Sequence, residues 1–486
     1  MYRLDPYTIE NSAQEHNQLR TSNRMALLGA VRHSIPEFKP IPYNSNLTND
    51  DIPKLCDMIR SSDPKDVIKG LNFINRMIQN RRGAISLICP CGLLPRLAEL
   101  AMSTDCSIQN FAVQISALLA SESDPQHDHQ YIECGLCARY AQILSTPFDN
   151  KYLNIFENAA RGIANVMFKS VQNRDVCLSY GFFEPFFHLC EIVYKTKPDP
   201  TIPAALGMVM KAITYGKPKP DDAYALSLLP LVHVFSNGFE GDIIIFMLET
   251  LKNISEFPRL VEILKNNENI QNMLVTNMGM HFADFQSIVL QVVQNCVSVL
   301  PQFWTALDKL FEKALEVLQY SVSPILPQLF TFMENFLEYP SCTQIALKYL
   351  SENERGIAFI VSETASQSTD CTRASLKLIR AILLATNGKA PQLIQMLNKK
   401  GLLQHMSSCL QRNFIQKDSQ CAQLITDTIF LDFNFNQDDA TLIEQFEESK
   451  GVEALDTVLI YQPQLLQISN QIKKFVFTKP ILMENL

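Results

Sequence analysis

The amino-acid sequence predicts an all-α solenoid, in which short helical repeats stack side by side around one continuous core. Three observations support this fold class: a turn-and-helix segment that recurs, apolar residues at helical spacing, and no convincing strand pattern. Apolar residues make up 47% of the 486 residues, which is ample for an extended core. Because each repeat of a solenoid contacts only its neighbours, a chain of this length can form one architecture throughout.

A short segment of one design recurs seven times along the chain. Each copy has a turn residue, usually Gly, followed by apolar residues and often by Pro. The copies begin at Gly92, Gly135, Gly181, Ser227, Asn269, Gly401 and Gly451. Gly can end one helix in the left-handed conformation, and Pro fits the first turn of the next. The first five copies lie about forty to fifty residues apart, which is the period of armadillo and HEAT repeats.

The apolar residues between these segments recur at steps of three and four, which is the spacing of one helix face. One series is Phe111, Ile115, Leu118 and Leu119, and another is Ile243, Phe246, Met247, Leu251 and Ile254. No stretch alternates convincingly with a period of two, so strands are not expected.

The charge balance argues against nucleic acid as a partner. Asp and Glu outnumber Lys and Arg by 50 to 42, and the formal net charge is -8. Neutralising phosphates requires clustered Lys and Arg, so this acidic chain is better suited to basic protein partners. The first residues lack the apolar core of a secretory signal, and no apolar stretch is long enough to span a bilayer. We therefore expect a soluble, intracellular protein without a membrane partner.

Two pairs of cysteines offer a candidate metal site. Cys89 and Cys91 lie about one repeat before Cys134 and Cys137, so four thiolates superficially suggest a structural zinc ion. Equivalent turns of neighbouring repeats lie on the order of 10 Å apart, which is too far for four sulfurs to share one ion. Core packing is therefore the preferred interpretation, and the 13 cysteines fit a reducing compartment.

No signature of an enzyme is found in the sequence. The Gly388-Lys389 pair lacks the upstream Gly and the following hydroxyl of a phosphate-binding loop. His127, Asp128 and His129 fall in a predicted polar loop, where a solvated turn is preferred over metal binding. We therefore expect no catalytic residues, no cofactor and no metal.

Several segments carry a family resemblance. They read DIPKLCDMI at 51–59, GLLPRL at 92–97, NAARGIAN at 158–165, YGKPKP at 215–220 and FEESKGVEALD at 446–456. In this order they resemble the first, third, fourth and closing repeats of the importin alpha family, the armadillo-repeat adaptors that carry nuclear-localisation signals. The resemblance covers about residues 10 to 480. It implies an armadillo-repeat right-handed superhelical solenoid of about nine to ten repeats over residues 46–480, with a short tail at 481–486.

The resemblance also implies a peptide-binding groove along the third helix of each repeat. In the family a Trp, followed four residues later by an Asn, forms a ladder on one helix face. The Asn amide holds the backbone of an extended peptide, and the Trp rings form slots for Lys side chains. The tryptophan positions are occupied in this chain by Gln114, Arg161, Met208, Glu249, Gln291, Thr331 and Lys377. The asparagine positions hold Asn165, Asn253, Asn295 and Asn335, with Leu118, Ala212 and Ala381 at the others.

Charge in this groove departs from the family pattern. Four residues beyond Asn165 the family carries an Asp that pairs with the key cargo lysine, and this chain has Lys169 there. Together with Arg161, Lys169 is expected to repel lysine-rich peptides. At about 4 Å two like charges cost about 1 to 4 kcal/mol, depending on exposure. The four asparagines could still hold an extended peptide backbone, or they could be helix-face residues that bond local carbonyls.

The N-terminal segment, residues 1–45, resembles the part of the family that binds importin beta. It keeps a helical pattern and retains Arg20, Arg24 and Arg32, but it lacks the dense basic clusters of the family. Importin beta is therefore the expected partner of this segment, with an association that charge complementarity supports only weakly.

An acidic stretch near the last repeats is a further candidate partner surface. It comprises Asp432, Asp438, Asp439, Glu444, Glu447 and Glu448. The family binds its export receptor at the final repeat, although a solvated helix and loop would carry the same charges. The leading functional expectation is a nuclear import adaptor that shuttles between cytoplasm and nucleus with protein cargo. The alternative is an armadillo scaffold that no longer recognises import signals.

Overall fold

The computed structural model describes the chain from residue 49 to residue 477 with internal gaps. The described residues are 49–80, 84–121, 129–257, 267–280, 282–297, 307–318, 320, 324–387, 390–436 and 440–477. Helices joined by turns make up this part of the chain, and no strand occurs in it. The predicted all-α class is therefore confirmed.

The chain forms two compact units, of which the first ends at Val209. Its helices range from short turns to two α-helices of 17 residues each. They are η1 (Asn49–Asp51), α2 (Ile52–Arg60), α3 (Pro64–Asn80), α4 (Ala84–Ile88), η2 (Cys89–Cys91), α5 (Leu94–Leu100), α6 (Cys106–Ser121), α7 (Gln130–Glu133), α8 (Leu136–Leu144), η3 (Asn150–Tyr152), α9 (Leu153–Lys169), α10 (Val171–Ser179) and α11 (Phe183–Thr196). Helix α12 (Thr201–Thr214) contains the boundary between the units.

The second unit begins at Met210 and contains the remaining helices. They are α13 (Asp222–Gly238), α14 (Asp242–Ser255), α16 (Glu268–Met278), α17 (Ala283–Val297), α18 (Leu307–Leu318), α19 (Leu326–Glu338), α20 (Pro340–Glu352), α21 (Glu354–Glu363), α22 (Thr369–Thr386), α23 (Pro391–Lys399), α24 (Leu402–Leu410), α25 (Asn413–Lys417), α26 (Ser419–Phe435), α27 (Ala440–Glu448), α28 (Gly451–Tyr461), η4 (Pro463–Leu465) and α29 (Leu466–Phe477).

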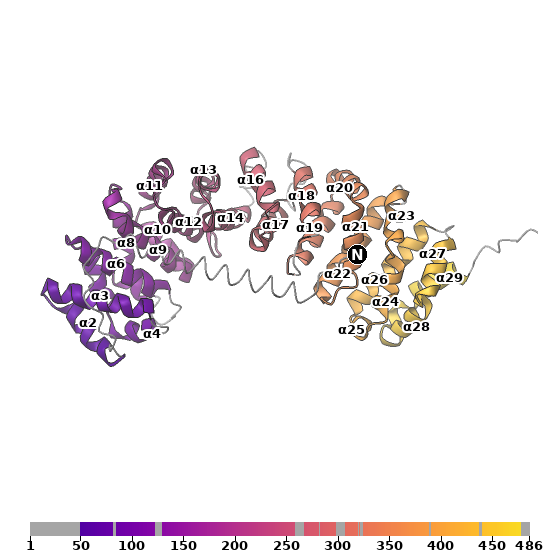
Figure 1. Cartoon of the computed structure of the whole chain (residues 1–486), viewed down its shortest axis with the longest axis horizontal. Helices are drawn as coiled ribbons and strands as arrows, with labels where there is room; N and C mark the ends of the chain where they lie inside the picture. The colour runs from indigo at the N-terminus through magenta and orange to yellow at the C-terminus, as the bar shows by residue number, and fades with distance from the viewer. Residues whose placement is uncertain are drawn as a thin grey trace, which may run out of the picture. The chain divides into compact units, whose positions relative to one another are not determined.

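Within each unit, the last helix of one repeat packs against the last helix of the next. We call these the third helices. In the first unit they are α3, α6 and α9, and in the second they are α14, α17, α19, α22, α26 and α29; α12 is the third helix that contains the boundary. Within each unit the third helices lie side by side (Figure 1). Each repeat therefore buries apolar surface mainly against its neighbours, as a solenoid does.

The core of each repeat is built from the inward faces of its helices. In the first unit Gly162 of α9 lies against Tyr140 of α8, and a Cβ atom at position 162 would lie 2.5 Å from the Tyr140 ring. The absence of a side chain at Gly162 lets the fully buried Tyr140 pack directly on the α9 backbone. The Tyr140 hydroxyl hydrogen-bonds the Ser116 hydroxyl of α6 at 2.7 Å, so this contact joins two repeats.

Four of the predicted turn glycines adopt the left-handed conformation. Gly92, Gly135, Gly181 and Gly401 have φ angles of 63°, 75°, 71° and 83°. Each stands between the end of one helix and the start of the next. The glycine signals at these positions are therefore confirmed, because a residue with a Cβ is disfavoured there.

The other three turn signals are placed differently by the structure. The segment that begins at Ser227 is not a turn, because it lies inside α13, which starts at Asp222 and carries Pro230 in its interior. The helix predicted after Asn269 begins earlier, where the Asn267 side chain accepts a hydrogen bond from the Ile270 backbone. At the last signal it is Lys450, with φ 57°, that takes the left-handed conformation before Gly451.

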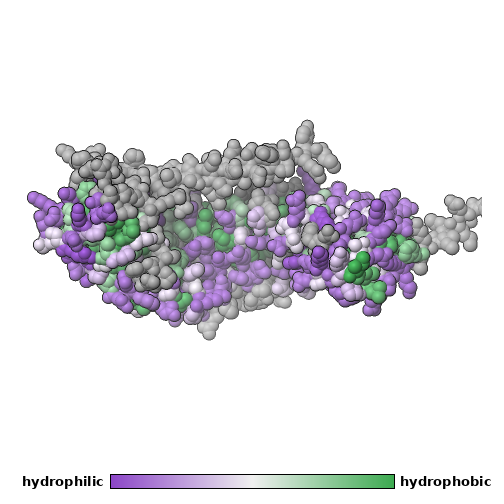
Figure 2. All heavy atoms as spheres, turned by 90° about the horizontal axis from the view of Figure 1, so that it is seen from below, coloured by the Kyte–Doolittle hydropathy of each residue, from purple (hydrophilic) through white to green (hydrophobic). Residues whose placement is uncertain are grey.

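One face of the described residues can be compared for its hydropathy. Figure 2 shows one face on which hydrophilic residues predominate and separate hydrophobic patches remain. None of the described helices is individually long and apolar enough to cross a membrane. One bent pair, Val171–Ser179 and Phe183–Thr196, meets the length and composition criteria together, with an 85° bend between its members.

Candidate functional site

The third helices present the positions that the sequence predicted as a ladder. Asn165 lies on α9, Asn253 on α14, Asn295 on α17 and Asn335 on α19. Each follows by four residues the position where the family carries Trp, so both members of a pair lie on one helix face. The structure thus places each of the four predicted asparagines on a third helix, four residues after the expected tryptophan position.

Three of these asparagines hydrogen-bond the preceding third helix. The Asn165 Nδ2 donates to the Ala117 carbonyl of α6 at 3.1 Å. The Asn253 Nδ2 donates to the Thr214 hydroxyl at the end of α12 at 3.2 Å, and the Asn295 Nδ2 donates to the Ser255 hydroxyl of α14 at 3.0 Å. These bonds join repeats, which neither alternative from the sequence, a peptide clamp or bonds to local carbonyls, anticipates. Each of these three amides thus uses at least one of its two N–H donors within the fold.

Sequence reasoning missed further polar bonds of the same kind. The Asn75 Nδ2 of α3 donates to the Gln114 side-chain oxygen of α6 at 3.1 Å. The Ser287 hydroxyl of α17 donates to the Gln328 side-chain oxygen of α19 at 2.8 Å. The recurrence of Asn, Gln and Ser on successive third helices, about one repeat apart, is the sequence signal that could have revealed them.

The predicted charged ladder residues have partners within the fold. Arg161 pairs with Glu157 one turn earlier on α9, with 2.9 Å between Nε and the carboxylate. Glu249 of α14 pairs with Lys211 of α12, and the Lys211 ammonium also lies 5.9 Å from the centroid of the Phe246 ring. The expected repulsion by Arg161 is therefore reduced, because the Glu157 carboxylate balances its charge.

Lys169 remains at the position where the family carries Asp. Its ammonium lies 5.8 Å from the centroid of the buried Tyr131 ring, a geometry that attracts the cation to the ring face. Gln291 of α17 is exposed, and its amide lies 3.5 Å from the Ser287 hydroxyl. Neither arrangement provides the aromatic slot that the family uses for lysine.

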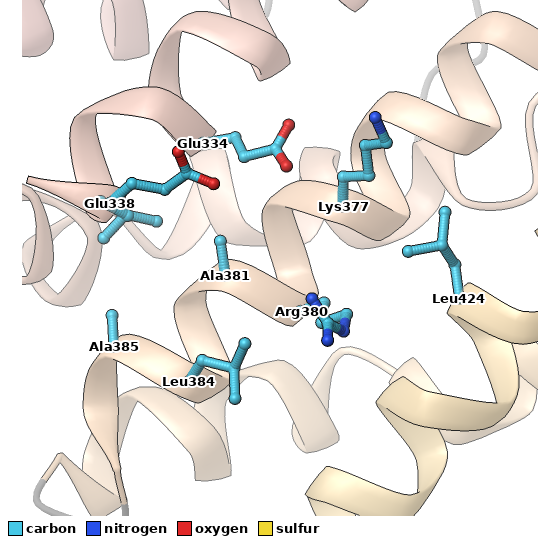
Figure 3. A pocket seen from close by; sticks show the side chains of 9 residues that line it. Glu334, Glu338, Lys377, Arg380, Ala381, Leu384, Ala385 and Leu424 are labelled. Atoms are coloured by element: carbon cyan, nitrogen blue, oxygen red, sulfur yellow. The ribbon is translucent and has the colours of Figure 1, made fainter.

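A cleft opens between three third helices of the second unit. It has a volume of about 330 Å³ and is lined from α19, α22 and α26 (Figure 3). The lining residues are Glu334, Leu337, Glu338, Lys377, Arg380, Ala381, Leu384, Ala385 and Leu424. Lys377 and Ala381 are the two ladder positions expected on α22, so the cleft belongs to the predicted groove face.

The charged groups of this cleft lie on opposite sides. Figure 3 shows the carboxylates of Glu334 and Glu338 on the α19 side and the Lys377 and Arg380 side chains on the α22 side. Burial raises the pKa of Glu334, and the neighbouring Glu338 adds to this effect, whereas Lys377 and Arg380 oppose it. The cleft therefore holds a carboxylate whose charged form the surroundings disfavour.

Metal binding has no geometric support in the described part of the chain. No group of three or more His, Cys, Asp or Glu side chains gathers there in a way that could hold an ion. Cys89 and Cys91 are partly buried, whereas Cys137 is fully buried beside Cys177, which raises the pKa of the Cys137 thiol through a hydrogen bond and through desolvation. A protonated thiol in such a place packs as a small apolar group.

The acidic stretch near the last repeats is divided by the structure. Asp432 is fully buried, and it accepts hydrogen bonds from the amides of Asn398 and Asn436 at 3.0 and 2.9 Å. It is therefore not part of a partner surface, contrary to expectation. Glu444, Glu447 and Glu448 are exposed on α27.

Several predicted features lie outside the described residues. They are Arg20, Arg24 and Arg32 of the N-terminal segment, and Asp438, Asp439, His127 and Asp128.

Comparison with known proteins shows similarity of structure and none of sequence family. No protein-family model matches the chain, and neither does any curated protein. An engineered protein solved by the Northeast Structural Genomics Consortium is 16% identical, with a TM-score of 0.66, over 88% of this chain and 98% of that one. The designed armadillo repeat protein YIII(Dq)4CqI is 14% identical, with a TM-score of 0.43, over 50% of this chain and 99% of that one. A computationally designed armadillo repeat protein for modular peptide recognition is 15% identical, with a TM-score of 0.44 over the same shares.

The repeat anatomy and the shared fold define the class of this protein. Repeats of a few helices, in which the last helix packs on its equivalents within each unit, are the armadillo pattern, and the engineered protein shares the fold over most of both chains. The chain is an all-α armadillo-repeat solenoid.

The bond between Asn253 and Thr214 predicts a measurable stability effect. Substitution Asn253→Ala removes a buried inter-repeat hydrogen bond worth about 1 kcal/mol, so the melting temperature should fall by about 2 °C. Asn335→Ala is the matched control, because no such bond among the described residues joins Asn335 to the preceding third helix. Thermal unfolding of both variants by circular dichroism measures the difference. Equal shifts would contradict a bridging role for Asn253.

Because the pKa of Glu334 is raised, replacing this residue by a neutral one should stabilise the fold at neutral pH. The folded state binds the Glu334 proton more tightly than the unfolded state, so ionisation lowers stability as pH rises above the ordinary pKa of 4.5. Glu334→Gln should therefore raise the melting temperature at pH 7 and leave it nearly unchanged at pH 4. The control is Glu352→Gln on the exposed surface of α20. A lower melting temperature for Glu334→Gln at pH 7 would show that the carboxylate stabilises the fold instead.

Proposed function

We propose that the protein is an adaptor that binds an extended segment of a partner protein along the faces of its third helices. The observation that carries this proposal is the cleft between α19, α22 and α26. Its charged side chains and the half-exposed Leu384 lie at the cleft, beside the ladder positions Lys377 and Ala381, rather than in the core. An armadillo surface of this kind needs no catalytic residue, and we propose no enzymatic role.

The finer proposal is a nuclear import receptor that carries protein cargo and shuttles between cytoplasm and nucleus. It is supported by the resemblance of the repeat segments and of residues 1–45 to the importin alpha family. In this proposal the N-terminal segment binds importin beta through Arg20, Arg24 and Arg32. The exposed carboxylates of α27 are the proposed contact for an export receptor.

The residues of the groove favour cargo signals other than the lysine-rich ones that the importin alpha family binds. None of the expected tryptophan positions holds an aromatic residue, so lysine side chains find no stacking slots. The amides of Asn165, Asn253 and Asn295 are engaged in bonds between repeats, which makes them weaker clamps for a peptide backbone. These observations favour the second candidate, a protein scaffold of the same architecture that no longer reads lysine-rich import signals.

A binding experiment with importin beta separates the two candidates. The full chain and a form lacking residues 1–45 are passed over immobilised importin beta. The import proposal predicts binding by the full chain, loss of binding after truncation, and at least a tenfold loss when Arg20, Arg24 and Arg32 are all replaced by Ala, because these are the basic residues that the segment retains for an acidic partner surface. Lys348→Ala on α20 is the control. Absence of binding by the full chain would reject the import role and leave the scaffold.

A further inference from the structure

We infer that the cleft between α19, α22 and α26 recognises a partner segment of mixed charge, with a basic and an acidic residue two positions apart. The inference rests on the proposed function, since it assumes that an extended segment crosses the third helices. It specifies the chemistry of that segment, which the proposed function leaves open.

The acidic side of the cleft comes from α19. Glu334 and Glu338 are four residues apart and therefore lie on one face of the helix. Among the described residues, neither carboxylate accepts a hydrogen bond or lies within ion-pair distance of a cation. Glu334 is half-buried, so water satisfies its charge incompletely. A cation from a partner would supply the missing counter-charge.

The basic side of the cleft comes from α22. Lys377 and Arg380 are one turn apart, and no hydrogen bond to a described residue engages either side chain. The Arg380 Nε atom is buried without a hydrogen-bond acceptor, and it lies 3.8 Å from the Asp427 carboxylate of α26. Asp427 is itself held by the Gln423 amide at 2.6 Å, so it provides a fixed charge beside the guanidinium. The remaining guanidinium donors can take a carboxylate in a two-pronged contact.

The surface between the acidic and the basic side is apolar and carries small side chains. Ala381 and Ala385 stand one turn apart on α22, where small side chains leave space for a ligand. Leu384 is 47% exposed at the same place, and Leu337 and Leu424 complete the lining. Such a surface suits the aliphatic part of a long side chain while the charged end reaches the rim.

The separation of the two sides fixes the spacing of the charges. Packed helices lie about 8 to 10 Å apart, and side chains on one face of an extended chain repeat at about 7 Å, every second residue. A basic residue directed to α19 and an acidic residue two positions away, directed to α22, therefore meet opposite charges at once. A uniformly basic segment meets Lys377 and Arg380 with like charge, and a uniformly acidic one meets Glu334 and Glu338 with like charge.

A display selection tests this inference. Random twelve-residue peptides are selected against the full chain, and selected peptides are measured by fluorescence anisotropy at low salt. We expect enrichment of a basic and an acidic residue two positions apart. The variant Lys377→Glu with Arg380→Glu makes the cleft acidic and should select uniformly basic peptides, while Glu334→Lys with Glu338→Lys should select acidic ones. Each double variant should bind the wild-type peptides at least tenfold more weakly.

Matched controls distinguish a failure of the mixed-charge inference from a failure of the adaptor function. Charge reversals on the outer helix α20, Lys348→Glu and Glu352→Lys, should leave the selected peptides unchanged, and circular dichroism verifies that all variants fold. Selection of uniformly basic peptides by the wild-type protein, or of the same peptides by all variants, would overturn the mixed-charge inference and leave the adaptor function intact. Failure to select any peptide would overturn the adaptor function itself.

Discussion

The packing of each third helix against the next is the constraint on which the rest of the structure depends. Apolar faces supply most of this contact, and amide side chains such as Asn165, Asn253 and Asn295 add hydrogen bonds across it. Because a buried amide group left without a partner is destabilising, these bonds also fix how neighbouring repeats are aligned. The same alignment decides which side chains are left on the surface of the third helices.

Which partner the surface can bind depends on the side chains that this packing leaves available. An asparagine that donates its amide to the preceding repeat offers less to a peptide, and Glu157 and Lys211 balance the charges of Arg161 and Glu249. The cleft on α19, α22 and α26 differs, since the carboxylates on its α19 side and the cations on its α22 side form no ion pair with each other. Holding the Glu334 charge in half-buried surroundings opposes stability, which is typical of residues kept for binding.

The sequence was sufficient for the helical class, for the left-handed turns at Gly92, Gly135, Gly181 and Gly401, and for the shared face of Lys377 and Ala381. These features depend on residues close together in the chain. The turn signal at Ser227 was wrong because α13 continues through this segment and contains Pro230 in its interior. The bonds between repeats and the burial of Asp432 could not be predicted, because they depend on the register of helices that lie about one repeat apart.

The central claim is that a partner segment lies on the third helices, and oxidative footprinting measures this most directly. The full chain, free and bound to a selected peptide, is exposed briefly to hydroxyl radicals, and side-chain oxidation is read by mass spectrometry. Binding should protect Leu384 and Leu424, while the exposed Leu226 of α13 and Ile460 of α28 should react as before. Protection of Leu226 or Ile460 without protection of Leu384 would place the partner elsewhere and contradict the account.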